Sequence, residues 1–217
     1  WLVNPLLVVG IPAVVWGLAR EWGGDKVARL AVVIAALSPA LWITAGSQMS
    51  HTSSVLAVGL TVWVAVRRPE SSWWWAIGGL TAAYGALARP MDALIIALPM
   101  LLWGLTRAPS FRARLAWIGL PAVGAALFFW DNHALTGSVL RLPMDMWFDG
   151  WTAEHGMVGC NQLGFGPNHG CAQTFGSLGH TPLKAAKIIG QTALELDSVL
   201  IGVPGAGLLA AFGAWRL

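Results

Sequence analysis

The sequence is poor in charge, in tyrosine and in cysteine. Only 11% of its residues are Asp, Glu, Lys or Arg, whereas about a quarter are charged in an ordinary soluble domain. A soluble chain of 217 residues, 56% of them hydrophobic, could not cover so much apolar surface with one core. The shortage of charge therefore excludes an ordinary soluble domain and favours lipid as the main solvent.

Familiar catalytic motifs are also missing from the sequence. It contains no Gly-rich phosphate loop, no G-x-S-x-G, no H-E-x-x-H and no C-x-x-C. The formal net charge of +3 is too small to indicate nucleic-acid binding. Function must therefore be sought in how the few polar groups are placed among apolar segments.

The apolar residues fall into seven runs that carry very little charge. In lipid such runs must be helical, because each has to satisfy its backbone hydrogen bonds internally. We therefore expect an all-α integral membrane protein with about seven transmembrane helices. The runs cover residues 2–19, 28–45, 54–66, 73–88, 91–106, 115–130 and 196–215.

The basic residues are distributed unevenly between alternate connections of these runs. One set of connections holds Arg20, Lys26, Arg29, Arg67, Arg68, Arg107, Arg112, Arg114 and Arg216, and the other holds Arg89, Arg141, Lys184 and Lys187. The positive-inside rule places the richer set in the cytoplasm. The segment Trp73–Trp75 follows a cytoplasmic connection and is expected to anchor the chain at the membrane interface.

This orientation predicts four parts of the chain. Residues 1–130 form six transmembrane helices, and residues 131–182 form an ordered extracytoplasmic loop with turns and short pieces. Residues 183–195 form an interfacial helix, with Thr181 as N-cap and Pro182 at its first position. Residues 196–217 form the last transmembrane helix. The chain begins at Trp1 and stops directly after an apolar run, so we expect it to be a fragment of a longer protein.

The long loop contains both cysteines of the chain, Cys160 and Cys171. On an extracytoplasmic face a disulfide between them is the expected pairing. A metal site that recruits His155, His169 or His180 is the alternative, but the C-x10-C spacing matches no standard zinc motif. A divalent metal requirement stays open, and no metal site is identified.

Arg89 lies between two apolar runs, directly before Pro90, in a short outer connection. It either extends to lipid head groups, as basic residues at helix ends do, or binds an anion at the membrane surface. An arginine suits phosphate because its planar guanidinium can donate two parallel hydrogen bonds. Other polar residues are expected on the same face, and together they frame a candidate cleft: Ser50, His51, Thr52, Asp92, Asp131, His133 and Arg141. Arg89, His51, Asp92, His133 and Arg141 are the candidate substrate-binding residues.

Three stretches carry a resemblance to a known family: "NPLLVVGIPAVVWGLAREWGG", "AALSPALWITAGSQMSHTSSVLAVGLTVWVAVRR" and "GALARPMDALIIALP". In this order they resemble the GT-C superfamily of polytopic glycosyltransferases, in particular bacterial proteins similar to dolichyl-phosphate-mannose protein mannosyltransferases. The later "ALTGSVLRLP", "LGFGP" and "HTPLKA" resemble the outer loop of one bacterial branch of that group. The resemblance covers nearly the whole chain through loose hydropathy patterns.

The resemblance implies a transferase that uses a polyprenyl-phosphate sugar on the outer face of the plasma (inner) membrane. Arg89 would face the carrier phosphate. The catalytic carboxylate would lie upstream of Trp1, so the fragment alone would be inactive. Where the family often has an Arg and an Asp, this chain has "GSQMSHT", with His51 as the titratable group.

Two other functions compete with the transferase. A transporter or flippase would favour ionisable groups near the middle of the membrane and inverted repeats, whereas the polar groups here collect at one surface. A membrane assembly subunit without chemistry is the other alternative. The expected partners are a polyprenyl-phosphate-linked sugar and the lipid bilayer, with no nucleic acid.

Overall fold

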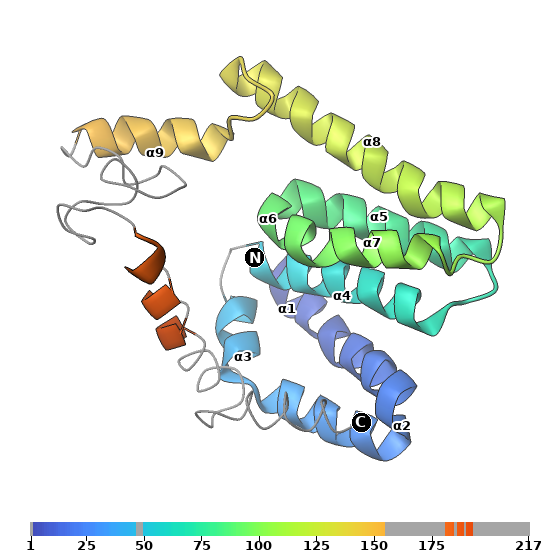
Figure 1. The fold of residues 1–217 in the computed structure, drawn as a ribbon. Coiled ribbons are helices and arrows are strands. Elements are labelled where there is room, and N and C mark those ends of the chain that lie inside the picture. The colour runs from blue at the N-terminus through green and yellow to red at the C-terminus, as the bar shows by residue number, and fades with distance from the viewer. Residues whose placement is uncertain (1, 47–49, 155–180, 185, 189, 193–217) are drawn as a thin grey trace. The chain divides into compact units, whose positions relative to one another are not determined.

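The computed structural model describes residues 2–46, 50–154, 181–184, 186–188 and 190–192, and every regular element within them is helical (Figure 1). The elements are α1 (Val3–Val8), α2 (Gly10–Leu37), α3 (Pro39–Gly46), α4 (His51–Arg67), α5 (Ser72–Ala88), α6 (Pro90–Asp92), the π-helix η1 (Ala93–Ala97), α7 (Leu98–Leu105), α8 (Phe111–Thr136) and α9 (Pro143–Glu154). The chain divides into two compact units, one holding Trp1–Phe128 and the other beginning at Phe129.

The all-helical fold agrees with the sequence, but the prediction of about seven membrane-spanning helices is wrong. In the described residues, two helical stretches are long and apolar enough to cross a membrane, Val3–Leu37 and Phe111–Thr136. The other apolar runs form shorter helices. α4 and α5 have 17 residues each, fewer than the roughly 20 that a typical hydrocarbon core needs. The last expected helix, at 196–217, lies outside the described residues.

The sequence predicts separate helices at 2–19 and 28–45 with a charged connection between them, whereas in the structure α2 continues from Gly10 to Leu37 through a bend. Gly24 has φ 71° and ψ −172° inside α2, a conformation that a residue with a Cβ rarely adopts. The helix therefore changes direction at this glycine while its hydrogen-bonded turns continue on both sides (Figure 1). The structural break between the two runs is a single residue.

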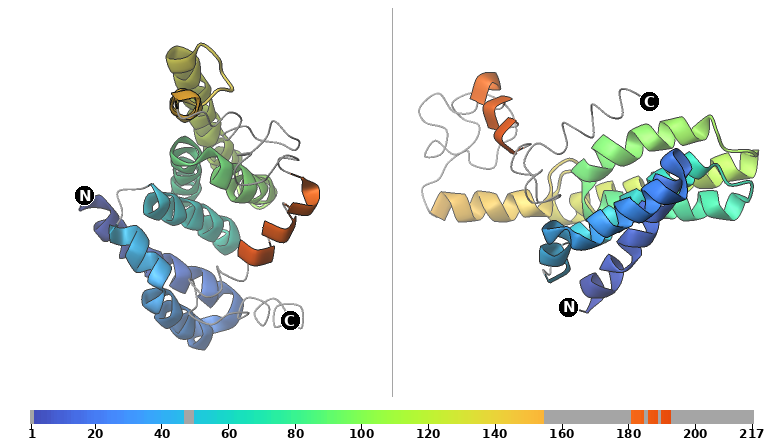
Figure 2. Two further views of the ribbon diagram at one scale, coloured as in Figure 1. Left: turned by 90° about the vertical axis from the view of Figure 1, so that its left-hand side faces the viewer. Right: turned by 90° about the horizontal axis from the view of Figure 1, so that it is seen from below.

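Helix α4 is the central element of the first unit. It packs against α5, α2 and α7, and it lies between the N-terminal helices and the α5–α7 segment in the left view of Figure 2. Inside the α4–α5 hairpin, the buried Thr61 hydroxyl lies 3.0 Å from Oγ1 of Thr81 and 3.2 Å from the Gly78 carbonyl. Such hydroxyl contacts hold apolar helices together where lipid or core offers no water.

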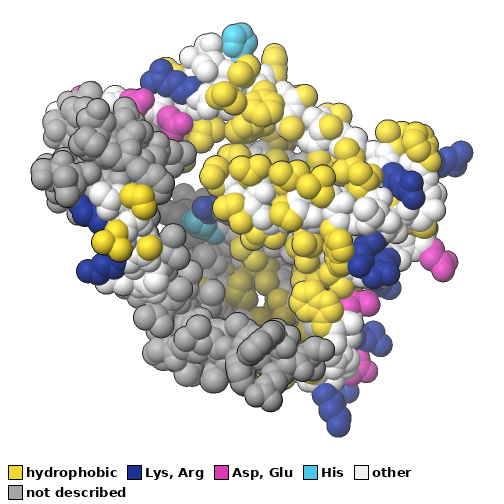
Figure 3. Space-filling model, viewed as in Figure 1, with side chains coloured by type: hydrophobic (Ala, Val, Ile, Leu, Met, Phe, Trp, Pro, Cys, Tyr) yellow, Lys and Arg dark blue, Asp and Glu magenta, His cyan; other side chains and the backbone are white. Residues whose placement is uncertain are grey.

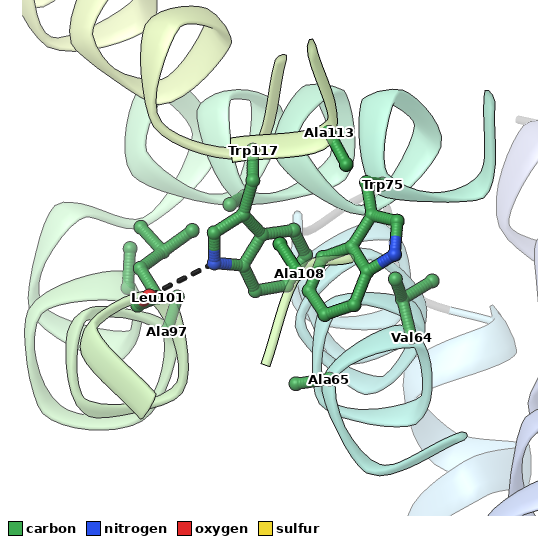
Figure 4. Packing of buried hydrophobic residues seen from close by; sticks show 10 residues of the cluster. Val64, Ala65, Trp75, Ala97, Leu101, Ala108, Ala113 and Trp117 are labelled. Carbon is green, nitrogen blue, oxygen red and sulfur yellow. Dashed lines mark hydrogen bonds between the residues drawn. The ribbon is translucent and has the colours of Figure 1, made fainter. Parts of the chain in front are cut away.

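The core of the first unit is built around two tryptophans. The rings of Trp75 and Trp117 meet edge to face, with centroids 5.0 Å apart and an interplanar angle of 83°. Neither side chain is exposed. The indole N–H of Trp117 donates to the Leu101 carbonyl at 2.8 Å (Figure 4), so its one polar atom is satisfied.

Glycines allow the helices to approach this pair closely. A Cβ on Gly78 would lie 2.4 Å from Cζ3 of Trp117, and one on Gly104 would lie 2.7 Å from the same ring. A Cβ on Gly79 would lie 2.6 Å from the backbone oxygen of Ala116. Small residues at helix contacts are typical of tightly packed apolar helices.

The expected interfacial anchor Trp73–Trp75 is wrong for one of its members. Trp73 is 70% exposed and Trp74 is 37% exposed, but Trp75 is fully buried. Its indole N–H donates to the Pro69 carbonyl at 2.8 Å. Three consecutive helical residues point about 100° apart, so they cannot all face the same surroundings.

The α4–α5 connection begins in an unusual backbone conformation. Arg68 ends α4 with φ 52° and ψ 58°, in the left-handed region, and its N–H donates to the Val64 carbonyl. Glycine is the usual residue at such a helix end. Ser71 then caps α5, because its side chain accepts a hydrogen bond from the N–H of Trp73.

In the second unit, helical structure extends into the segment expected to be a loop. Helix α8 continues to Thr136 and α9 follows at Pro143–Glu154. In the turn between them, Oγ1 of Thr136 lies 2.8 Å from the Asn132 carbonyl, 2.9 Å from the Ser138 carbonyl and 3.1 Å from the Arg141 carbonyl. Its single proton can be donated to one of these oxygens at a time. The start of the loop expected at 131–182 is therefore largely helical.

The helix expected after Pro182 is present in the described residues 182–184, 186–188 and 190–192. The N–H of Lys184 donates to Oγ1 of Thr181 at 3.3 Å, which confirms Thr181 as the N-cap. Its position along a membrane interface stays a prediction.

Candidate functional site

The α4–α5 hairpin brings two of the candidate binding residues together. His51 begins α4 and Arg89 ends α5, so a tight antiparallel turn places them at the same end of the hairpin. Nη1 of Arg89 is in hydrogen-bond contact with Nδ1 of His51 and lies 3.2 Å from its Nε2. A guanidinium can only donate, so the imidazole nitrogen accepts. Both residues are half-buried.

The backbone around Arg89 explains why the guanidinium is held at this point. Arg89 has φ −151° and ψ 85°, the extended conformation that a following proline favours. Its N–H donates to the Gly85 carbonyl at 2.8 Å, and its own carbonyl accepts from the N–H of Ala93 at 3.1 Å. Arg89 therefore joins two helices with its backbone satisfied, and its side chain extends from the break.

The N-terminus of α4 contributes a second favourable feature for an anion. His51, Thr52 and Ser53 form the first turn, and the Ser50 side chain makes no capping bond to it. The N–H groups of a first turn and the positive end of the helix dipole attract negative charge. The Arg89 side chain lies beside this turn through its contact with His51.

Two hydroxyls near this turn lack a partner. Oγ1 of Thr52 and Oγ of Ser54 are buried and, in the part of the chain that the structure describes, have no hydrogen-bond partner. Ser54 is one turn after His51 on the stripe that faces α5, because Val58 and Thr61 on that stripe contact Gly85 and Gly78. An unpaired buried hydroxyl costs about 1–3 kcal/mol, so Ser54 is a polar group next to the His51–Arg89 pair that could serve a ligand.

The sequence singled out His51 and Thr52 but missed Ser54. The signal was present in the spacing, since residues three apart share one helix face. It was hidden because "HTSS" resembles a simple helix start, where Ser and Thr are common.

The other candidates lie on other elements. Asp92 closes α6, three residues after Arg89. His133, exposed in the last turn of α8, and Arg141 belong to the second unit. Arg141 forms an ion pair with Asp149, with Nη2 and Oδ2 2.9 Å apart and both side chains about half exposed. Asp131 is exposed in α8. The disulfide candidates Cys160 and Cys171 lie outside the described residues.

Among the described residues, no group of three or more His, Cys, Asp or Glu side chains is gathered as a metal ion would require. The guanidinium of Arg89 and the buried hydroxyl of Ser54 give the hairpin site a chemistry that suits an oxyanion such as phosphate.

Comparisons with known proteins found no matching family model, no matching curated protein and no matching solved structure.

Proposed function

We propose that this chain is part of a bacterial inner-membrane glycosyltransferase that moves a sugar from a polyprenyl-phosphate donor to an acceptor on the extracytoplasmic face. The observation that carries the proposal is the contact of Arg89 with His51 beside the first turn of α4. Two helices long and apolar enough to cross a membrane and the resemblance of the sequence to GT-C enzymes support it.

The reaction needs a cation where the carrier phosphate departs. The acceptor hydroxyl loses its proton to a carboxylate and attacks the anomeric carbon. The bond between that carbon and the phosphate oxygen breaks, and its electron pair stays on the phosphate. The phosphate thus gains negative charge, which a positioned guanidinium stabilises more strongly in the transition state than in the ground state.

Arg89 would supply this cation, and His51 would position it. The accepting imidazole nitrogen fixes one edge of the guanidinium, and the planar shape of that group suits phosphate oxygens. The first turn of α4 would add backbone donors and the dipole. The proposal assigns the catalytic base to no residue of this chain, so the test uses the full-length protein.

The test is sugar transfer from a polyprenyl-phosphate sugar by full-length protein in membranes. Arg89→Ala is expected to lower transfer by about 100-fold or more, the scale of losing a key charge-stabilising donor, and Arg89→Lys to recover part of it. Arg112→Ala is the control, because Arg112 is exposed in α8. Near-normal transfer by a well-expressed Arg89→Ala protein would refute the assignment.

A further inference from the structure

A pocket lies between α2 and α4, within the first unit. It holds about 260 Å³ and is lined by Trp16, Gly17, Arg20, Glu21, Trp63 and Arg67. This volume is a little below the roughly 300–1,000 Å³ of sites for drug-sized molecules. The pocket therefore suits a small charged group rather than a whole lipid or a sugar chain.

The pocket is formed by two tryptophan–arginine pairs with the same spacing. Trp16 and Arg20 on α2, and Trp63 and Arg67 on α4, are four residues apart, so each pair shares one helix face. The faces meet because Gly17 has no side chain: a Cβ there would lie 2.3 Å from Cε2 of Trp63. The two aromatic–cationic pairs thus line one space.

The charges of the pocket are of both signs. The Arg67 guanidinium lies 5.5 Å from the ring centroid of Trp63 and 5.8 Å from that of Trp74, a cation–π arrangement that positions it. Nε of Arg20 lies 2.9 Å from Oδ1 of Asp25. Glu21 also lines the pocket and, among the described residues, makes no ion pair.

Glu21 weakens the attraction of Arg67 and Arg20 for a purely anionic ligand. A ligand with a cation next to its anion would use all three groups, with the anion on Arg67 and Arg20 and the cation on Glu21 or on an indole face. The lining residues therefore favour a zwitterionic group.

The surroundings of the pocket indicate where such a group would come from. Lys and Arg side chains gather at this end of the first unit, near the α4–α5 and α7–α8 connections and the bend of α2 (Figure 3). Trp73 is 70% exposed just beyond Arg67. Exposed tryptophans among basic residues are typical of the head-group region of a membrane.

A third tryptophan–arginine pair lies at the C-terminal end of α7. Its members, Trp103 and Arg107, are also four residues apart, and the Arg107 guanidinium lies 3.6 Å from the ring centroid of Trp103. Desolvation and the nearby charge of Arg68 lower the pKa of Arg107. Positive charges are therefore crowded at this end of the unit, which adds to its attraction for phosphate.

We propose that the pocket between α2 and α4 binds the head group of a phospholipid that carries an amine beside its phosphate, such as phosphoethanolamine. Arg67 and Arg20 hold the phosphate, and Glu21 holds the ammonium. The acyl chains extend along the apolar surface outside the pocket. The proposal requires contact with a membrane and does not depend on the transferase activity.

The test measures binding of short-chain lipids to the full-length protein in detergent, after removal of endogenous lipid, by native mass spectrometry. Dihexanoyl phosphatidylethanolamine is compared with dihexanoyl phosphatidylglycerol and with free phosphoethanolamine. We expect the ethanolamine lipid to bind about tenfold more tightly than either. A preference for the glycerol lipid would overturn the role of Glu21, and equal binding of free phosphoethanolamine would overturn the lipid assignment.

Substitutions locate the site. Arg67→Gln should weaken binding of the ethanolamine lipid about tenfold, whereas Arg112→Gln, which removes an exposed arginine outside the pocket, should not change it. Unchanged affinity in Arg67→Gln would overturn the pocket as the site. Glu21→Gln should weaken binding of the ethanolamine lipid and strengthen binding of the glycerol lipid. If Glu21→Gln only disturbed the packing of the pocket, it would weaken binding of both lipids. Weaker binding of both lipids would therefore contradict the proposal.

Discussion

The two ends of the α4–α5 hairpin hold an arginine in different ways. At one end, Arg89 is in contact with the imidazole of His51, next to a helix start and a buried unpaired hydroxyl. At the other end, Arg67 lies over two indole rings at the end of a helix. The first arrangement orients hydrogen-bond donors, and the second fixes a charge on an apolar surface. The same type of side chain is thus held by a hydrogen bond to an imidazole at one end and by two aromatic rings at the other.

The largest expected effect comes from removing the packing that both ends share. Trp117→Ala deletes a fully buried ring that contacts Trp75 and donates to Leu101. We expect a loss of about 3–5 kcal/mol in the free energy of unfolding, measured by chemical unfolding in detergent. Both lipid binding and transfer should fall with it.

The control for this prediction is Trp130→Ala in the same helix. Trp130 is 68% exposed, so the change should be within about 0.5 kcal/mol. Equal destabilisation by the two substitutions would show that the Trp75–Trp117 contact does not support the hairpin.

A smaller effect is expected from closing the gap between α5 and α8. Gly79→Ala places a Cβ 2.6 Å from the backbone oxygen of Ala116, and backbone cannot move aside as a side chain can. We expect about 1–3 kcal/mol of destabilisation in the same unfolding experiment. Gly119→Ala is the matched control, because its Cβ would meet only Leu115, at 4.0 Å. There the better helix propensity of alanine should be neutral or stabilising.

A double-mutant cycle tests whether the two ends are independent. His51 and Arg89 are in contact, so their alanine substitutions should be coupled by about 0.5–3 kcal/mol. His51 and Arg67 lie at opposite ends of α4, about 24 Å apart along the helix axis. His51→Ala and Arg67→Gln should therefore be additive within about 0.5 kcal/mol. Strong coupling between the two ends would mean that they work as one unit.

The smallest expected effect is the difference between substitutions of Trp73 and Trp74, the two exposed tryptophans at the Arg67 end of the hairpin. The ring centroid of Trp74 lies 6.2 Å from that of Trp63, and Trp74 also lies under Arg67, so Trp74→Ala should cost about 1 kcal/mol of unfolding free energy. Trp73 is more exposed, and Trp73→Ala should change it by less than about 0.5 kcal/mol. If Trp73→Ala lowered the free energy of unfolding more than Trp74→Ala did, Trp73 would be the residue that stabilises this end of the hairpin.

The hairpin was the part of the fold best predicted from sequence. The expected runs 54–66 and 73–88 correspond to α4 and α5, because Ser, Pro and charged residues mark the connection clearly. His51 and Arg89 are equally far in sequence from Glu70, which lies in the connection between α4 and α5. In a tight antiparallel hairpin, two residues equally far from the connection lie opposite each other. Their shared end followed from the helix order, but their direct contact depends on side-chain packing that hydropathy does not describe.

The number of spanning helices was not predictable from the runs. Hydropathy finds apolar stretches, but the bend at Gly24 and the π-helix Ala93–Ala97 depend on backbone conformation. The pocket was missed for a related reason. Trp16 and Trp63 come from helices far apart in the sequence, and their approach requires the absent side chain of Gly17.

Because the backbone of Arg68 is left-handed and that of Arg67 is helical, the two adjacent positions should tolerate different substitutions. Arg67 is helical, so a series of substitutions there should be tolerated in the order of helix propensity, with alanine good and glycine poor. One residue later the order should invert: glycine and asparagine would fit without strain, and valine or isoleucine would fit worst. Neighbouring arginines would thus respond to replacement by opposite rules.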